Sequence, residues 1–233
     1  MKKNSLLVLF ALLCLVSAGA QTPDPNQKSH PDSGSWANLF KDDLSNAVYP
    51  PGIWSMTDGE LTASQDECIW SEGQYDSFIL DFEFRMGEAA NSGVIVYCSD
   101  LKNWIPNSVE IQILDDYAEK WRDVPATWKC GGLFGHLAPS KQTVKKAGEW
   151  NRMTVTCQGT MIEVMLNGEV VVRSDIKKWT SAKTNPDGSE IPAWLSRPMA
   201  ELQTRGHIGL QGKHGGAPIF FRQIKIKGLR LAS

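Results

Sequence analysis

Apolar and polar residues alternate over short stretches of this chain, a pattern typical of β-strands. The clearest stretch covers residues 77–86, whose apolar members are Phe78, Leu80, Phe82, Phe84 and Met86. Successive side chains of a strand point to opposite faces. We therefore expect one face of this strand to lie in a core and the other, which carries Asp81, Glu83 and Arg85, to face water.

Comparable short runs recur to the end of the chain, separated by Gly, Pro, Asn and Asp. They predict strands over residues 94–98, 109–114, 153–157, 161–166, 170–173, 207–211 and 219–226. Asn167-Gly168, between two of these runs, is typical of a type I′ hairpin turn. No segment has a long helical stripe and no internal repeat is visible, so the pattern predicts an all-β antiparallel sandwich.

Two stretches, residues 115–129 and 177–204, are too long for hairpin turns and are predicted to be functional loops. Tryptophan is concentrated in predicted loops, at Trp104, Trp121, Trp128, Trp179 and Trp194. Flat indole rings stack on the apolar faces of sugar rings, which suggests a saccharide cleft. The alternative is that these rings close the ends of the sandwich.

The N-terminus predicts a secretory signal peptide over residues 1–20. Its apolar run, 6–16, is shorter than a membrane-spanning helix, and Ala18 and Ala20 stand where a cleavage site needs small residues. Lipidation at Cys14 is less favoured, because Leu12 and Leu13 precede it. We expect a periplasmic or secreted protein without a membrane span.

Residues 21–34 are polar and without period, and predict a disordered linker to one domain over 35–233. Basic and acidic residues are interspersed and the net charge is -2, which argues against a nucleic-acid partner. Free, buried cysteines are favoured over disulfides at Cys68, Cys98, Cys130 and Cys157. Nothing in the sequence fixes the oligomeric state.

Several predicted strands carry Gln, Glu or Arg on their polar sides, at Arg85, Glu110, Gln112, Gln211 and Arg222. If these strands share a sheet, the side chains line one surface between the two long loops. The alternative is an ordinary solvated outer face.

Candidate acid–base groups are few. Glu110 and Asp115 have an odd spacing, so a cooperating pair would need a bulge between them. Conventional two-carboxylate glycosidase chemistry is therefore poorly supported. His136 and His214 each precede or follow glycine at a predicted strand end and could act as a general acid or base.

An ordered series of motifs is more specific than any one of these features. It comprises W-S-M-T-D-G at 54–59, Y-D-S-F-I-L-D-F-E-F-R at 75–85, N-S-G-V at 91–94, V-E-I-Q-I-L-D at 109–115, G-E-W-N at 148–151, L-N-G at 166–168 and I-G-L-Q at 208–211. This series resembles the 3-keto-disaccharide hydrolase domain family over about residues 36–228. The resemblance implies a concanavalin A-like jelly roll of two antiparallel sheets, export to the periplasm, and a saccharide substrate oxidised at the 3-position.

The resemblance also implies the residues of a cleft. To these residues the strand and tryptophan patterns add Arg85 and Trp128. The predicted site then comprises Glu110 and His214 as catalytic residues and Arg85, Asn91, Gln112, Asp115, Gln211, Arg222 and Trp128 as substrate-binding residues. One departure concerns His214. Members commonly read L-Q-x-H-G, whereas this chain has one further residue before the histidine.

The chemistry implied by the family needs one base rather than two matched carboxylates. A ketone at C3 acidifies the C2 proton, so that elimination at C1 followed by hydration cleaves the glycoside. Our hypothesis is that Glu110 or His214 is the base, and that Arg222, Arg85 or a divalent metal, calcium or a transition ion, stabilises the enolate. The alternative function is a non-catalytic carbohydrate-binding module.

Overall fold

The computed structural model describes residues 29–229 of the chain and shows an all-β fold. The strands are β1 (Ala37–Asn38), β2 (Ala47–Val48), β3 (Trp54–Thr57), β4 (Glu60–Ala63), β5 (Ile69–Tyr75), β6 (Phe78–Met86), β7 (Asn91–Cys98), β8 (Val109–Leu114), β9 (Trp150–Gln158), β10 (Met161–Leu166), β11 (Glu169–Asp175), β12 (Gly206–Leu210) and β13 (Ile219–Gly228). All the predicted strands are present, most of them within two residues of the predicted bounds.

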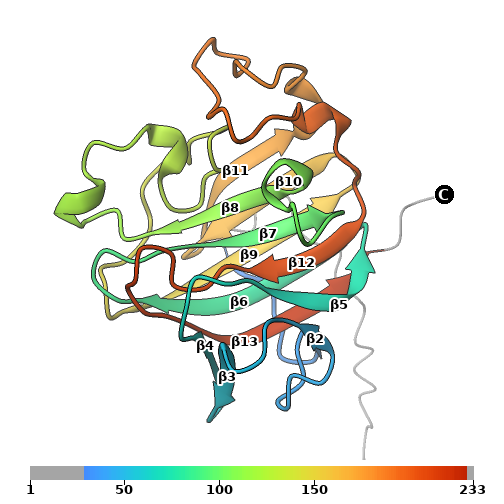
Figure 1. Ribbon diagram of the computed structural model, residues 1–233, viewed down its shortest axis with the longest axis vertical. Helices are drawn as coiled ribbons and strands as arrows, with labels where there is room; N and C mark the ends of the chain where they lie inside the picture. Colours follow the sequence, from blue (N-terminus) through green and yellow to red (C-terminus); the bar gives the residue numbers. More distant parts are fainter. Residues whose placement is uncertain (1–28, 230–233) are drawn as a thin grey trace, which may run out of the picture.

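The strands form two antiparallel sheets that pack face to face (Figure 1). One has eight strands in the order β11-β10-β9-β6-β13-β4-β3, with β1 paired to β13, and the other has five in the order β2-β5-β12-β7-β8. The predicted jelly-roll sandwich is confirmed.

The core lies between the sheets and is filled by the apolar positions of the alternating strands. On β6, the five apolar side chains that start at Phe78 are at most 1% exposed. On β8, Val109, Ile111 and Ile113 point into the same core. The side chains between them, Glu110 and Gln112, therefore point outward from the five-stranded sheet.

The β10–β11 hairpin turns at Asn167-Gly168, as predicted. Both residues have positive φ, 51° and 85°. A type I′ turn requires this conformation at both central positions, and Asn and Gly adopt it at little cost.

The two long loops contain no strands. They hold four of the five short 3₁₀ helices, which are η1 (Ile105–Asn107), η2 (Glu119–Trp121), η3 (Ala126–Trp128), η4 (Ile176–Lys178) and η5 (Met199–Glu201). Within residues 29–229, no helix has the length and apolar composition needed to cross a membrane.

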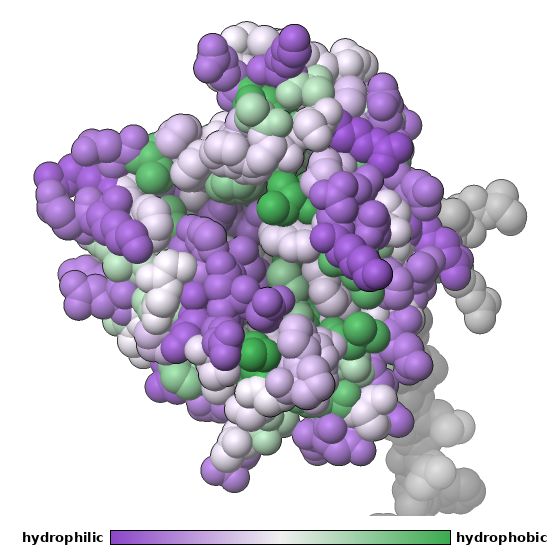
Figure 2. Space-filling model, in the orientation of Figure 1, coloured by the Kyte–Doolittle hydropathy of each residue, from purple (hydrophilic) through white to green (hydrophobic). Residues whose placement is uncertain are grey.

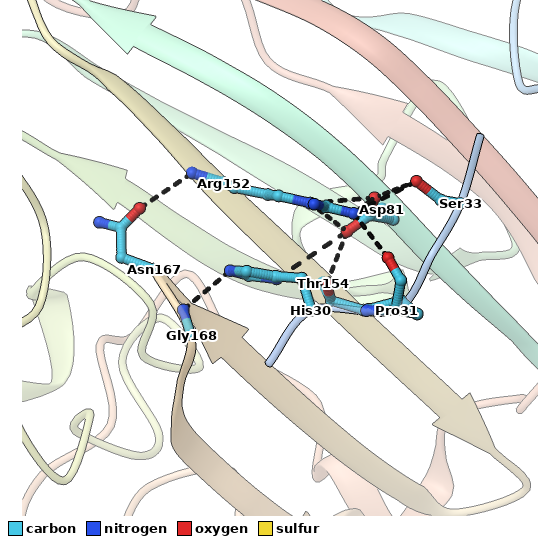
Figure 3. A network of polar contacts seen from close by, with 8 residues as sticks. All are labelled: His30, Pro31, Ser33, Asp81, Arg152, Thr154, Asn167 and Gly168. Carbon is cyan, nitrogen blue, oxygen red and sulfur yellow. Dashed lines mark hydrogen bonds and ion pairs between the residues drawn. The ribbon is translucent and has the colours of Figure 1, made fainter. Parts of the chain in front are cut away.

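The segment before β1 lies against the eight-stranded sheet (Figure 3). Asp81 on β6 is only 2% exposed, although alternation placed it on the wet face. Its carboxylate accepts hydrogen bonds from Ser33, Thr154 and Arg152, and Arg152 also donates to the carbonyl oxygen of Pro31 at 2.7 Å. The prediction of a disordered linker is therefore wrong for residues 29–34, because these residues cover a buried carboxylate. The rest of the predicted linker and the predicted signal peptide lie outside the described residues.

His30 links this segment to the β10–β11 turn. Its Nδ1 lies 2.7 Å from Thr154 Oγ1, and its Nε2 accepts the backbone N–H of Gly168 at 2.8 Å. The acceptor role of Nε2 defines a neutral imidazole with its proton on Nδ1. Burial and the neighbouring Arg152 lower the pKa of His30, which favours the same neutral form.

The four cysteines expected after processing are all free and buried, as the sequence favoured. Desolvation raises the pKa of each thiol, to about 11 for Cys98 and about 12 for Cys157. A raised thiol pKa keeps the reactive thiolate scarce.

Candidate active site

A cavity of about 340 Å³ opens on the outer face of the five-stranded sheet. We call it the acid–base cavity. It is lined by Asn91, Trp104, Ile105, Glu110, Gln112, Trp128, Phe134, Trp194, Gln211 and His214. Figure 2 shows hydrophobic and hydrophilic side chains side by side around a hollow near the middle of the molecule. Six of the nine residues predicted for the site line this one cavity.

Glu110 is the carboxylic acid of the cavity. Its carboxyl group lies over Gly93 on the neighbouring strand β7, which has no side chain to occupy this space. Desolvation, with a smaller effect of the negative charge of Asp66, raises the pKa of Glu110 to about 8. Glu110 is therefore largely protonated at neutral pH and can donate a proton.

His214 lies across the cavity mouth in the segment after β12. Its backbone forms an isolated antiparallel bridge with Asn91, and its ring donates from Nδ1 to Asp66 Oδ2 at 2.6 Å. In the neutral form of the ring, this contact places the proton on Nδ1 and leaves Nε2 free to accept one. A carboxylate that orients an imidazole in this way prepares it to accept a proton. The extra residue before His214 does not move it out of the site.

Amide side chains form the floor. Gln112 is buried, and its Nε2 donates to Asn91 Oδ1 at 2.8 Å and to the carbonyl oxygen of Ser92 at 3.0 Å. The backbone of Gln211 is fixed by a hydrogen bond from its N–H to the carbonyl oxygen of Gly93. Gln112 thus orients Asn91, and the amide groups of Asn91 and Gln211 face the cavity.

Aromatic rings form one wall. The ring of Trp128 lies 5.0 Å from that of Phe134 and 6.0 Å from that of Trp194, between ring centroids. Trp194 is 52% exposed. Trp104 also lines the cavity. Trp121 and Trp179 do not, and instead donate their ring N–H groups to partners within the fold, the carbonyl oxygen of Ala89 and Asn185 Oδ1.

Arg85 and Arg222 are not part of this cavity. They lie on β6 and β13 of the eight-stranded sheet, so the assumption that all the polar strand faces share one sheet is wrong. Arg85 pairs with Glu60 at 3.0 Å, and Arg222 pairs with Glu83 at 2.6 Å and stacks on the ring of Trp150. The outer faces of both sheets produce the same alternation, which is why the sequence could not separate them.

Asp115 is also outside the cavity. Its carboxylate accepts the backbone N–H groups of Ala89 at 2.9 Å and Tyr117 at 3.3 Å. Together with Arg85 it lines a different cavity, of about 600 Å³. Because both of its oxygens hold the backbone, Asp115 has a structural role in shaping the turn after β8.

His136 does not reach the acid–base cavity either. It is 8% exposed, and its Nδ1 donates to the carbonyl oxygen of Phe134 at 2.8 Å. Burial lowers the pKa of His136. Of the two candidate histidines, His214 alone lines the cavity.

The structure also tests whether these residues suit a divalent metal. Across residues 29–229, no three His, Cys, Asp or Glu side chains come together in an arrangement that could hold a metal ion. Glu110 and His214 line the same cavity, and Asp66 binds the histidine ring. Among the described residues, carboxylate, thiol and imidazole ligands alone therefore form no metal site, whereas the hypothesis from the sequence also included amide oxygens.

Sequence reasoning missed Asp66, which binds His214, and Phe134 and Ile105, which line the cavity. Asp66 lies in the turn between β4 and β5, where an acidic residue carries no signal of its own. Phe134 and Ile105 are single apolar residues in loops, which are common in any β-sandwich.

The fold and the cavity define a jelly-roll protein in which a buried carboxyl group and a carboxylate-bound imidazole line one pocket. The chain belongs to the family of 3-keto-alpha-glucoside-1,2-lyase-like domains, whose sequence profile matches residues 26–227. The resemblance found in the sequence motifs is confirmed.

Solved structures are similar over most of the chain. A proposed glycosyl hydrolase from Parabacteroides distasonis shares 54% identity, with a TM-score of 0.81, over 84% of this chain and all of that one. A second proposed glycosyl hydrolase of that organism shares 20% identity, with a TM-score of 0.68, over 88% of this chain and all of that one. A carbohydrate-binding module, CBM66, from Bacillus subtilis shares 10% identity, with a TM-score of 0.51, over 81% of this chain and 99% of the module. The last two similarities show the fold alone. No curated protein matches the chain.

Proposed function

We propose that this protein cleaves 3-keto-glycosides by elimination across C1 and C2. The observation that carries the proposal is the pairing, in one cavity, of a carboxyl group that is protonated at neutral pH with an imidazole held by Asp66. Titratable groups whose environments separate their protonation states are suited to acid and base roles. Membership of the 3-keto-alpha-glucoside-1,2-lyase-like family supports this reaction class.

His214 is the base in this mechanism. The C3 ketone acidifies the hydrogen on C2, and His214 Nε2 takes that proton while the electron pair of the C2–H bond becomes an enolate. The amide groups of Asn91 and Gln211, which line the cavity, are the donors available to the C3 oxygen. The sequence left the base open between Glu110 and His214, and the geometry favours His214.

Glu110 is the acid. As the C1–O bond breaks, Glu110 donates its proton to the departing oxygen, and a C1–C2 double bond remains. Water then adds hydroxyl to C1 and hydrogen to C2, which gives the free 3-keto sugar. No step requires a second carboxylate, and Asp115, whose oxygens bind the backbone, is not needed.

The aromatic wall suits the sugar ring. The rings of Trp128, Phe134 and Trp194 present flat apolar surfaces beside the amide floor. A site with a few placed polar groups and aromatic walls is typical of small-ligand binding. We infer that the saccharide stacks on this wall with C1 and C2 toward Glu110 and His214.

The test is turnover of a 3-keto-glucoside, measured as the product released with and without a chelator. We expect wild-type activity, loss in Glu110→Gln and His214→Ala, and full activity in Glu149→Gln, which changes an exposed glutamate outside the cavity. Saccharide binding without turnover by wild type would instead favour a carbohydrate-binding module. Activity that persists in both site variants would exclude these residues.

We also propose that the protein is exported, on the basis of the N-terminal signal pattern in residues 1–20. Replacement of Ala18 and Ala20 by bulky residues should block cleavage, so that the full-length chain accumulates. Fractionation of cells that express wild type and this variant would decide the point, and a cytoplasmic wild-type protein would contradict it.

A further inference from the structure

A second cavity, of about 600 Å³, adjoins the acid–base cavity on the same face. We call it the apolar cavity. Four residues, Trp104, Ile105, Gln211 and His214, line both cavities. A ligand whose reacting bond lies at His214 would therefore extend from one cavity into the other.

The walls of this second cavity are hydrophobic. The apolar and aromatic residues of its lining include Val48, Tyr49, Pro50, Trp70 on β5, Leu101 and Trp104. The rings of Trp70 and Trp104 meet edge to face, with centroids 6.1 Å apart. The polar side chains that line it, Asp66, Glu67, Lys102, Gln211 and His214, are outnumbered by the apolar and aromatic ones, and Asp66 is bound to His214.

Exposed hydrophobic residues gather at this face. Among residues 29–229, five large hydrophobic residues are exposed, and three of them, Val48, Ile105 and Trp194, line the two adjoining cavities. Exposed apolar surface that collects around a cleft indicates a binding site. The hydroxyl groups of a second sugar ring that lay against Val48, Pro50 and Leu101 would lose the hydrogen bonds that water gives them. An aromatic ring needs no hydrogen-bond partner there.

We propose that the apolar cavity receives the leaving group of the substrate and selects an aromatic, apolar aglycone. This inference rests on the proposed function, because it places the sugar ring in the acid–base cavity. The protein would then act on aryl 3-keto-glycosides in preference to those with small or sugar leaving groups.

The test compares two substrates with the same sugar, phenyl 3-keto-glucoside and methyl 3-keto-glucoside. Val48→Asp places a carboxylate in the wall of the apolar cavity only. We expect kcat/KM for the phenyl substrate to fall about tenfold, because an apolar ring would have to desolvate the new charge, and kcat/KM for the methyl substrate to stay within about twofold. Comparison of each variant with wild type on one substrate cancels the intrinsic reactivity of the leaving group.

Leu101→Asn places a polar amide at another residue that lines the apolar cavity and not the acid–base cavity, and should give the same selective loss. Met161→Asp is the matched control, since Met161 is an exposed apolar residue on β10 of the other sheet. It should leave both substrates unaffected. An equal loss for both substrates in both wall variants, or no loss for the phenyl substrate, would overturn the proposal.

The outcome separates the two proposals. If wild type turns over neither substrate, the proposed function fails, and titration calorimetry with unoxidised phenyl glucoside tests the apolar cavity alone. Binding that weakens about tenfold in Val48→Asp would support the cavity as a site for an aromatic group. Equal affinity in both proteins, or no binding to wild type, would refute it.

Discussion

Gly93 lies beneath the carboxyl group of Glu110, so closely that a β-carbon at position 93 would overlap with Glu110 Oε1. We predict that Gly93→Ala displaces the Glu110 side chain and lowers kcat/KM by about 10- to 100-fold, because small misplacements of a catalytic group are costly. Steady-state kinetics on a 3-keto-glucoside would measure this loss.

The same variant should remain well folded. The atoms that must move belong to a flexible side chain at a cavity, and alanine in a strand costs less conformational entropy than glycine. We expect the Tm to change by no more than about 4 °C, which corresponds to ~1 kcal/mol in a domain of this size. A collapse of the Tm together with activity would point to a structural role for Gly93 instead.

The pKa of Glu110, raised to about 8, predicts the alkaline side of the pH–rate profile. A general acid must be protonated, so kcat/KM should fall as the pH rises through about 8. Glu110→Gln should lower kcat by about 10²- to 10⁴-fold and remove this descent.

Asp66→Asn gives a sharper test of the same assignment. Removal of the negative charge of Asp66 eases the ionisation of Glu110, so the descent should move to lower pH. The maximal rate should also fall, because His214 loses its orienting partner. A descent that stays in place or moves to higher pH would contradict the role of Glu110.

His30 makes stability depend on pH. The pKa of His30 is lowered in the folded protein, by burial and by Arg152 against the opposing charges of Asp81 and Glu83. The stabilisation that the neutral ring provides is therefore present above the unfolded pKa of about 6.5 and is lost as the pH falls through the folded pKa. Protonation of Nε2 would also remove the bond from Gly168.

We therefore expect the Tm difference between wild type and His30→Gln to shrink by a few degrees, about 2–4 °C, between pH 7.5 and pH 5. Ser33→Ala is the matched control. It removes a hydrogen bond to the carboxylate of Asp81 but no titratable group, and should lower the Tm by a similar amount at both pH values. A constant difference for His30→Gln would refute the effect.

Trp194 should contribute to sugar binding and little to stability, since it is 52% exposed on the cavity wall. Trp194→Ala is expected to raise KM about 3- to 10-fold, the range for one aromatic stacking contact. Tyr117→Ala, at a similarly exposed residue that does not line the acid–base cavity, should leave KM unchanged. If both variants raised KM alike, the stacking wall would be misassigned.

The strands could be predicted because alternation is a local property. The stretch that begins at Phe78 and the Asn167-Gly168 turn each specify their conformation within a few residues. Which outer face a polar residue occupies depends instead on strand order. Glu110 and Arg222 both occupy polar positions of alternating strands, yet they lie on opposite outer faces of the sandwich.

The partner of His214 could not be predicted for a related reason. Asp66 is 148 residues away in the chain and reaches the histidine only because the turn before β5 lies beside the segment after β12. Asp81 shows the converse, since its strand position predicts exposure, whereas the tertiary placement of Ser33 and Arg152 buries it.

The reactivity of the four buried thiols reports how often the fold opens. An alkylating reagent reacts with thiolate, and at neutral pH these groups hold little of it while the sandwich stays closed. Cys98 lies on β7 and Cys157 on β9, one in each sheet. Their labelling rates, read separately by mass spectrometry, would therefore report whether the two sheets separate together or one at a time, without any engineered probe.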